Sequence, residues 1–242
     1  MSCRTRSRDE RGAVVVEAAL VLPLLLMLLF GIIEVGGAIK SYSSAANAAR
    51  AGGRMASVAG NEAMADQQIL ERVAGEASGL PNGEIEYVII WNSTGVGETP
   101  PAACIAAAGA ASAPNTSPVG VYDGGNSTKG ACNVYIRPDA PGGAFQMARG
   151  ELASPPEFYF GCLAPGEPNK VDCNWSPKNR KVRISPRVLP VGTPEANRLT
   201  PDYVGVFVRA SHDYYTGIIG STLTITEGSV NLLEPDNFGV NT

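Results

Sequence analysis

The apolar positions of this chain are concentrated in one uninterrupted stretch near its start. From Ala18 to Ile33 no residue is charged, and most are Leu, Val, Ile, Ala or Phe. A helix that crosses a bilayer needs roughly 20 mostly apolar residues, at about 1.5 Å of rise each. Extending the stretch to residues 13–39 provides that length, with Glu17 and Glu34 close to its ends. The pattern therefore predicts a transmembrane helix over 13–39.

The same helix is expected to continue to about residue 57. Small residues recur there at four-residue spacing, which lets two backbones approach closely. One line of them holds Ser44, Ala48 and Gly52, and the other holds Ala45, Ala49 and Gly53. The spacing favours a packing face, although an Ala-rich sequence produces the same pattern by chance. Which faces meet stays open at this point.

A second helix is expected over about 61–78, where apolar residues recur near one face before Leu80-Pro81-Asn82-Gly83 ends it. Alternating apolar residues then predict strands at 84–92, 132–138, 180–185, 203–211 and 221–226. In the first strand one face holds Ile85, Tyr87, Ile89 and Trp91, and in the fourth it holds Val204, Val206, Val208 and Ala210. The stretch 92–130 shows little periodicity and is expected to be a long loop.

Helices first and strands afterwards indicate the α+β class. We expect a long N-terminal transmembrane helix that continues into an extracytoplasmic domain with a second helix and a small antiparallel sheet. The outer end of the long helix should pack on one face of that sheet. The expected organisation is a leader at 1–12, the membrane segment at 13–39, a helical region at 40–80 and a β-rich region at 81–242.

The distribution of charged residues predicts on which side of the membrane each end of the chain lies. Residues 1–12 carry four Arg against one Asp and one Glu, and the whole chain of 242 residues has a net charge of −4, so the remainder carries −6. Basic residues before a membrane helix stay on the cytoplasmic side. The N-terminus is therefore expected inside, and everything after Lys40 outside the cytoplasm. An acidic outer region argues against nucleic acid or anionic lipid as its partner.

Cysteine usage agrees with an oxidising outer compartment. Cys3 lies in the leader, whereas the other four lie beyond the membrane segment: Cys104, Cys132, Cys162 and Cys173. An even outer set predicts two disulfides. Of the three connectivities, sequence neighbours are favoured, because each pair encloses a loop rich in Pro, Gly and Asn. The spacing lacks the close Cys pairs of a zinc site.

Catalytic chemistry finds little support in the sequence. His212, beside Asp213, is the single histidine, and no G-x-S-x-G motif accompanies it. A Ser-His-Asp site would depend on that histidine. No phosphate-binding loop of the G-x-x-x-x-G-K-[ST] form occurs. We therefore expect a non-enzymatic protein without a cofactor or bound metal.

The start of the apolar stretch carries a more specific signal. A basic leader, then Gly12, then an apolar run with Glu17 at the fifth position, resembles the class III signal of type IV pilin-like proteins. The resemblance implies that a prepilin peptidase cuts after Gly12 and that Ala13 becomes the N-terminus. Ala13 and Glu17 are four residues apart and share a helical face. The new ammonium would then neutralise Glu17 of its own or a neighbouring helix. Ala18 stands where many members have Phe or Tyr.

Two further stretches carry a resemblance to one family. AARAGGR at 48–54, and LVLPLLLMLLFGIIEVG at 20–36 with Pro23 inside, are similar to TadE-like pilus-assembly proteins. The resemblance covers residues 11–56. It implies a pilin-like fold and a minor pilin or pseudopilin that assists assembly of a tight-adherence (Flp-type) pilus or a related envelope apparatus.

Partners and placement follow from the same resemblance. The partners would be a prepilin peptidase, other pilin-like subunits and an inner-membrane platform, and the location the bacterial cytoplasmic membrane. The residues that would take part in helix assembly are Glu17, Glu34, Ala45, Ala49 and Gly53.

Two rival hypotheses remain. The first is an anchored extracytoplasmic binding domain or hydrolase that shares only the anchor. The second is a secreted protein cut near Ala46-Asn47-Ala48, which has the small-x-small form of a signal-peptidase site. The apolar stretch is long for a signal peptide, whose apolar region typically runs about 7–15 residues.

Overall fold

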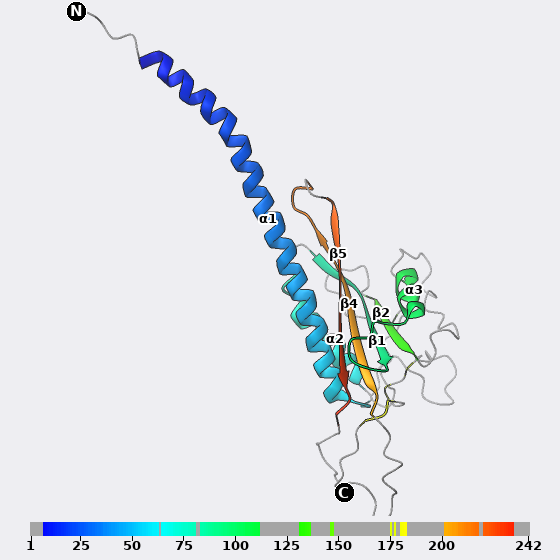
Figure 1. Cartoon of the computed structure of the whole chain (residues 1–242). Coiled ribbons are helices and arrows are strands. Elements are labelled where there is room, and N and C mark those ends of the chain that lie inside the picture. Colours follow the sequence, from blue (N-terminus) through cyan, green and yellow to red (C-terminus); the bar gives the residue numbers. More distant parts are fainter. Residues whose placement is uncertain are drawn as a thin grey trace, which may run out of the picture.

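Figure 1 shows the fold of the chain as a computed structural model. It describes residues 7–62, 64–80, 83–111, 131–136, 146–147, 175, 177, 180–182, 201–217 and 220–234. The elements in chain order are α1 (Ser7–Ala59), α2 (Ala65–Ala77), β1 (Gly83–Ser93), α3 (Ala102–Ala111), β2 (Cys132–Ile136), β3 (Gln146–Met147), β4 (Tyr203–Asp213) and β5 (Thr222–Leu232). The α+β class is confirmed.

Helix α1 has two halves in different surroundings. It is one continuous helix of 53 residues, and it includes Pro23. From Gly12 to Ile33 every residue except the half-buried Gly31 is exposed, and the apolar half projects away from the rest of the molecule (Figure 1). Among the described residues it is the one helix long and apolar enough to cross a membrane. The helix begins at Ser7, earlier than expected, because Arg and Glu in the leader are good helix formers.

The outer half of α1 and helix α2 cover one face of the sheet. The sheet is antiparallel with the strand order β3-β2-β1-β4-β5. Ala48 and Ala49 of α1 share a buried cluster with Ile69 and Val73 of α2 and with Val206 of β4. Burying these apolar side chains contributes roughly 25 cal/mol for each Å² removed from water. Helix α3 covers the opposite face (Figure 1), which makes three layers.

Strand β1 differs from the expected alternation at its start. The register with β4 shifts between Ile85 and Tyr87. A β-bulge inserts one extra residue, which moves the preceding side chain to the other face. Ile85 therefore packs with Val88 in the cluster under α1 and α2, whereas Tyr87 belongs to the cluster under α3, with Ile89 and Trp91. The expectation that Ile85 shares a face with the other three was wrong.

Two other expectations need correction. The stretch 92–130 is not all loop, because α3 occupies Ala102–Ala111, and 112–130 lie outside the described residues. A run rich in Ala, the best helix former, explains that helix. In the expected strand 180–185 the described residues 180–182 are not in a strand. Arg180 is instead drawn inward, where its guanidinium forms an ion pair with Asp66 at 2.5 Å.

The last hairpin follows the expected pattern. In β4, Val204, Val206, Val208 and Ala210 are all buried on the side of α1. Strand β5 continues to Leu232, beyond the expected end at 226, because it pairs with β4 along the whole of Tyr203–Asp213. The two strands run up beside α1 towards its apolar half (Figure 1).

Candidate functional site

The best-defined polar cluster among the described residues of α1 lies where its apolar half meets the outer domain. We name it the helix–hairpin junction: Glu34, Gly37 and Ser41 of α1, with His212, Tyr215 and Thr216 of the β4–β5 hairpin. Residues at these α1 spacings share one helical face. The turn of the hairpin is closed by a bond from the Tyr214 amide to the Ser221 carbonyl at 3.0 Å.

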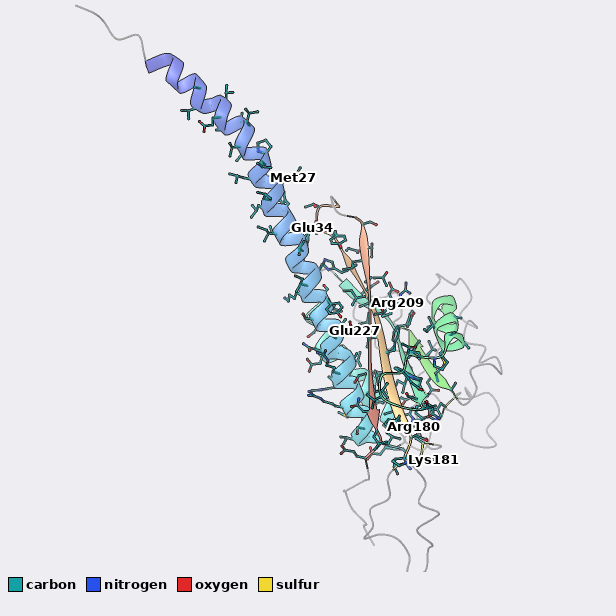
Figure 2. All side chains as sticks on the ribbon, in the orientation of Figure 1. Met27, Glu34, Arg180, Lys181, Arg209 and Glu227 are labelled. Carbon is teal, nitrogen blue, oxygen red and sulfur yellow. A yellow bond between two sulfur atoms is a disulfide. The ribbon has the colours of Figure 1, made fainter. Side chains whose placement is uncertain are left out.

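Glu34 is the central residue of the junction. Its side chain is buried and accepts hydrogen bonds from the Tyr215 amide at 2.9 Å and from the Thr216 hydroxyl at 2.6 Å, and also from the Thr216 amide. A buried carboxylate is costly unless hydrogen bonds satisfy it, and these three donors do so. In Figure 2 Glu34 faces the turn of the hairpin. Two of the donors are backbone amides, for which the sequence offers no signal.

The single histidine belongs to the same junction. The Ser41 hydroxyl lies 2.9 Å from Nδ1 of His212, and both residues are fully buried. A substrate has no access to a serine hydroxyl that water does not reach. Asp213, the neighbour considered for a catalytic site, is exposed and accepts a hydrogen bond from Thr222. The geometry therefore gives His212 a packing role against α1.

Gly37 allows the close approach of the hairpin. A Cβ atom built at this position would lie 3.2 Å from Cε2 of Tyr215 and 3.3 Å from Cε1 of His212. Such distances are tighter than ordinary contacts between carbon atoms. The missing side chain thus leaves room for the two rings. The rings of His212 and Tyr215 meet edge to face, with centroids 6.2 Å apart.

The small residues of α1 pack within the same chain. Ala45 and Ala49 are buried. A Cβ built at Gly53 would collide with Ser229 and Asn231 of β5. The spacing expected to bring two backbones together therefore brings α1 onto its own sheet.

The predicted processing residues lie at the other end of α1. Gly12, Ala13 and Glu17 are exposed on the apolar half. A Cβ at Gly12 would meet no atom within 4 Å. Their roles in cleavage and assembly stay predictions.

The structure joins Cys104 of α3 to Cys132 of β2, with an S–S distance of 2.01 Å. Both residues are buried in the cluster between α3 and the sheet. Cys3, Cys162 and Cys173 lie outside the described residues.

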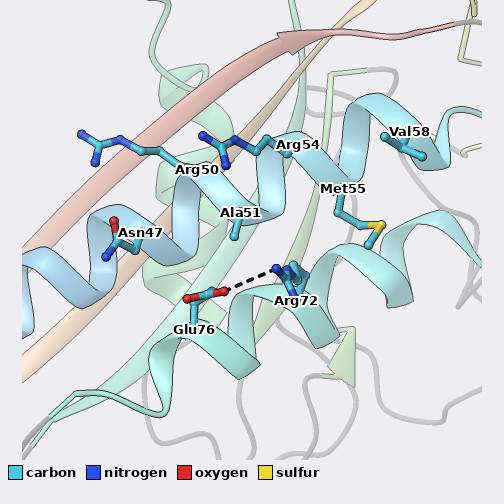
Figure 3. A pocket seen from close by; sticks show the side chains of 8 residues that line it. All are labelled: Asn47, Arg50, Ala51, Arg54, Met55, Val58, Arg72 and Glu76. Atoms are coloured by element: carbon cyan, nitrogen blue, oxygen red, sulfur yellow. Dashed lines mark ion pairs between the residues drawn. The ribbon is translucent and has the colours of Figure 1, made fainter.

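A basic groove runs between α1 and α2 (Figure 3). It has a volume of about 560 Å³, and its lining consists of Asn47, Arg50, Ala51, Arg54, Met55, Val58, Arg72 and Glu76. Arg72 pairs with Glu76 at 3.6 Å on the exposed surface of α2. The sequence carries no signal for this groove, because the groove forms only where two helices meet. In the described part of the chain no group of His, Cys, Asp and Glu is arranged to hold a metal ion.

Comparison with known proteins identifies a family that matches part of the chain. The family of TadE-like proteins matches residues 12–54, a range that includes Gly12, Glu17, Glu34 and the AARAGGR stretch. The chain matches none of the curated proteins and none of the solved structures. The resemblance seen in the sequence is therefore confirmed over the segment that forms most of α1. Across residues 12–54, the chain is similar to TadE-like proteins.

Proposed function

We propose that the protein is a membrane-anchored structural subunit, a minor pilin or pseudopilin, that assists assembly of a tight-adherence (Flp-type) pilus or a related envelope apparatus. The observation that carries the proposal is α1, because its matched segment combines an exposed apolar half with an outer half packed in a folded domain. A pilin-like helix is expected to combine these two parts, one for the membrane and one for the folded domain. Family likeness supports pilin-type partners and membrane association, and argues for a structural, non-enzymatic role.

The placement that suits this role is a single membrane pass in the bacterial cytoplasmic membrane. Residues 1–12 would form a cytoplasmic leader, 13–39 the membrane segment, 40–80 the outer helical region and 81–242 the β-rich domain. The Arg residues of the leader support an inside N-terminus, because positive residues are retained on the cytoplasmic side.

A prepilin peptidase is the first proposed partner. It would cut after Gly12 and expose the ammonium of Ala13 to Glu17. The test is N-terminal sequencing of the mature protein from native membranes, for the wild type and for Gly12→Val. The matched control is Gly31→Val, since an added Cβ meets no atom within 4 Å at either glycine. We expect Ala13 as the first residue in wild type and control, and an uncut chain in Gly12→Val. A mature chain that begins at Met1 or within 46–49 would contradict the proposal.

The remaining partners are other pilin-like subunits and an inner-membrane platform. Glu17 is exposed on the apolar half of α1. A carboxylate in hydrocarbon costs about 2.5–3.5 kcal/mol on insertion scales. Glu17→Val should therefore insert at least as well as the wild type but crosslink less to pilin-like partners. Val16→Ala, one residue away, serves as the control. Undiminished crosslinks in Glu17→Val would remove Glu17 from assembly.

A further inference from the structure

The height of Glu34 along α1 can be compared with the thickness of a bilayer. Ala13 and Glu34 are 21 residues apart, which corresponds to about 32 Å of helix at 1.5 Å per residue. The hydrocarbon core of a bilayer is about 30 Å thick. If the helix enters the bilayer near Ala13, Glu34 stands at the outer edge of the hydrocarbon. Exposed apolar residues continue just beyond it, with Val35 at 50% and Ile39 at 62% exposure.

The turn of the β4–β5 hairpin is held at that same height. The amides of Tyr215 and Thr216 are bonded to the Glu34 carboxylate, and the ring of Tyr215 lies against Gly37. Lys40 comes about 9 Å further along the helix than Glu34. The turn therefore lies on the membrane side of Lys40, and it cannot withdraw without breaking its bonds to Glu34.

The side chains of the turn suit the zone between hydrocarbon and water. Tyr215 is 53% exposed, although its amide is bonded to a buried carboxylate. Tyrosine is enriched at membrane interfaces, because the ring is apolar and the hydroxyl can remain hydrated. From Tyr214 to Gly217 no residue carries a charge. The turn thus offers an uncharged, aromatic surface beside an apolar helix.

We propose that the turn Tyr214–Gly217 rests in the headgroup region of the outer leaflet, as a second membrane contact beside α1. This inference rests on the proposed single-pass placement of α1. The occupant of the surface is lipid, because the height of the turn is fixed by its bonds to a helix that spans the bilayer. An uncharged tyrosine contact requires no anionic headgroup, which agrees with the acidic outer domain. Two contacts at one side of the domain hold the sheet at a fixed inclination to the membrane.

The experiment uses the full chain in two sets of phosphatidylcholine vesicles. In one set the lipids carry bromine near the headgroup end of the acyl chain, at the depth proposed for the turn. In the other set they carry it near the bilayer centre, at the depth of Leu25. Bromine quenches tryptophan fluorescence on contact. The reporter is Tyr215→Trp, with Tyr214→Trp as a second reporter from the same turn. Tyr203→Trp, at the opposite end of β4, is the matched control outside the membrane, and Leu25→Trp reports on the spanning helix. The wild-type signal of Trp91 and Trp175 is subtracted, and equal near-ultraviolet circular dichroism shows that the variants share one fold.

We expect both turn reporters to lose fluorescence in the vesicles brominated near the headgroup end, whereas Tyr203→Trp keeps it in both sets. Quenching of Leu25→Trp with turn reporters as bright as Tyr203→Trp would overturn the second contact and leave the anchor intact. The same holds if a turn reporter is shielded from water but unquenched, since a protein surface would then cover the turn. An unquenched Leu25→Trp would overturn the membrane placement of α1 and the contact with it.

Discussion

Asp66 and Arg180 form a fully buried ion pair, although 114 residues separate them in the sequence. The second carboxylate oxygen of Asp66 accepts hydrogen bonds from the Tyr135 hydroxyl at 2.5 Å and the Asn133 amide at 2.8 Å. The guanidinium of Arg180 lies 4.5 Å above the ring of Trp175. The pair therefore joins α2 and β2 to a segment far along the chain.

Removing one partner of this pair should destabilise the outer domain strongly. Asp66→Asn leaves the buried guanidinium without a counter-charge, and such changes cost about 3–5 kcal/mol. Denaturant unfolding in detergent measures the loss. The control is Arg72→Ala, which breaks a pair whose side chains are 58% and 39% exposed and should cost under about 1 kcal/mol. Equal effects of the two variants would contradict the structural role of the buried pair.

Glu34→Leu should release the hairpin turn from α1. The two amides and the Thr216 hydroxyl lose their charged acceptor, and a hydrogen bond to a charged group is worth about 1.5–3 kcal/mol. We expect proteolysis to begin within the turn, while membrane insertion is kept because an apolar residue replaces a charge. The control is Val35→Leu, which changes the neighbouring residue, whose side chain is exposed. It should leave the cleavage pattern unchanged. A turn that stays as resistant in Glu34→Leu as in wild type would show that these bonds do not hold it.

Gly52→Ala should weaken the packing of α1 on the domain. The added Cβ would lie 2.5 Å from Cγ2 of Val73 and 3.0 Å from Cγ1 of Val206. Overpacking of a well-filled core typically costs about 1–3 kcal/mol. Gly36→Ala is the control in the same helix, where a Cβ meets no atom within 4 Å. There Ala should stabilise the helix by up to about 1 kcal/mol. Thermal unfolding of both variants tests whether Gly52→Ala lowers the stability and Gly36→Ala raises it.

Reduction or replacement of the Cys104–Cys132 bond should loosen the face covered by α3. The two cysteines are 28 residues apart. A closed loop of that length is worth roughly 3–4 kcal/mol in the chain-entropy account. Cys104→Ser with Cys132→Ser should therefore raise protease sensitivity near α3, and Cys3→Ser should not. Peptide mapping without reduction also tests the second predicted bond, Cys162–Cys173. Free outer thiols in the mature protein would contradict both bonds and the oxidising placement.

The pKa of Glu98, in the loop after β1, allows a test by pH titration. A hydrogen bond from the Thr94 side chain, helped by the Thr94 amide and the Ser93 hydroxyl, lowers the pKa of Glu98 from its ordinary 4.5. Because the pKa of Glu98 is lower in the folded than in the unfolded chain, its ionised form stabilises the fold at a pH above the ordinary pKa. That stabilisation is lost as the pH falls through the lowered pKa of the folded chain. Thr94→Val should move the Glu98 pKa back upward in an NMR titration. An unchanged pKa would show that the Thr94 hydroxyl is not the cause.

The sequence predicted the parts of the fold that depend on local periodicity. The apolar run before Glu34 and the alternation in β4 are strong one-dimensional patterns, and both elements form as expected. The bulge before Tyr87 was missed, because one inserted residue changes the face of Ile85 without changing composition. The family resemblance found the α1 segment, whereas the junction at Glu34 depends on backbone donors 181 and 182 residues away. Contacts of that kind leave no trace in the pattern of either segment.

The unbroken course of α1 makes the direction in which the domain faces a property of its anchor. One continuous helix carries both the exposed apolar side chains and the helical face that packs on the sheet, so a rotation of α1 about its axis also turns the sheet. A change of one residue in the helical side that meets a neighbour turns the domain by about 100°. In the proposed membrane placement, the rotation of α1 about its axis would therefore determine which surface faces a neighbouring subunit, that of α3 or the groove of Arg50 and Arg54.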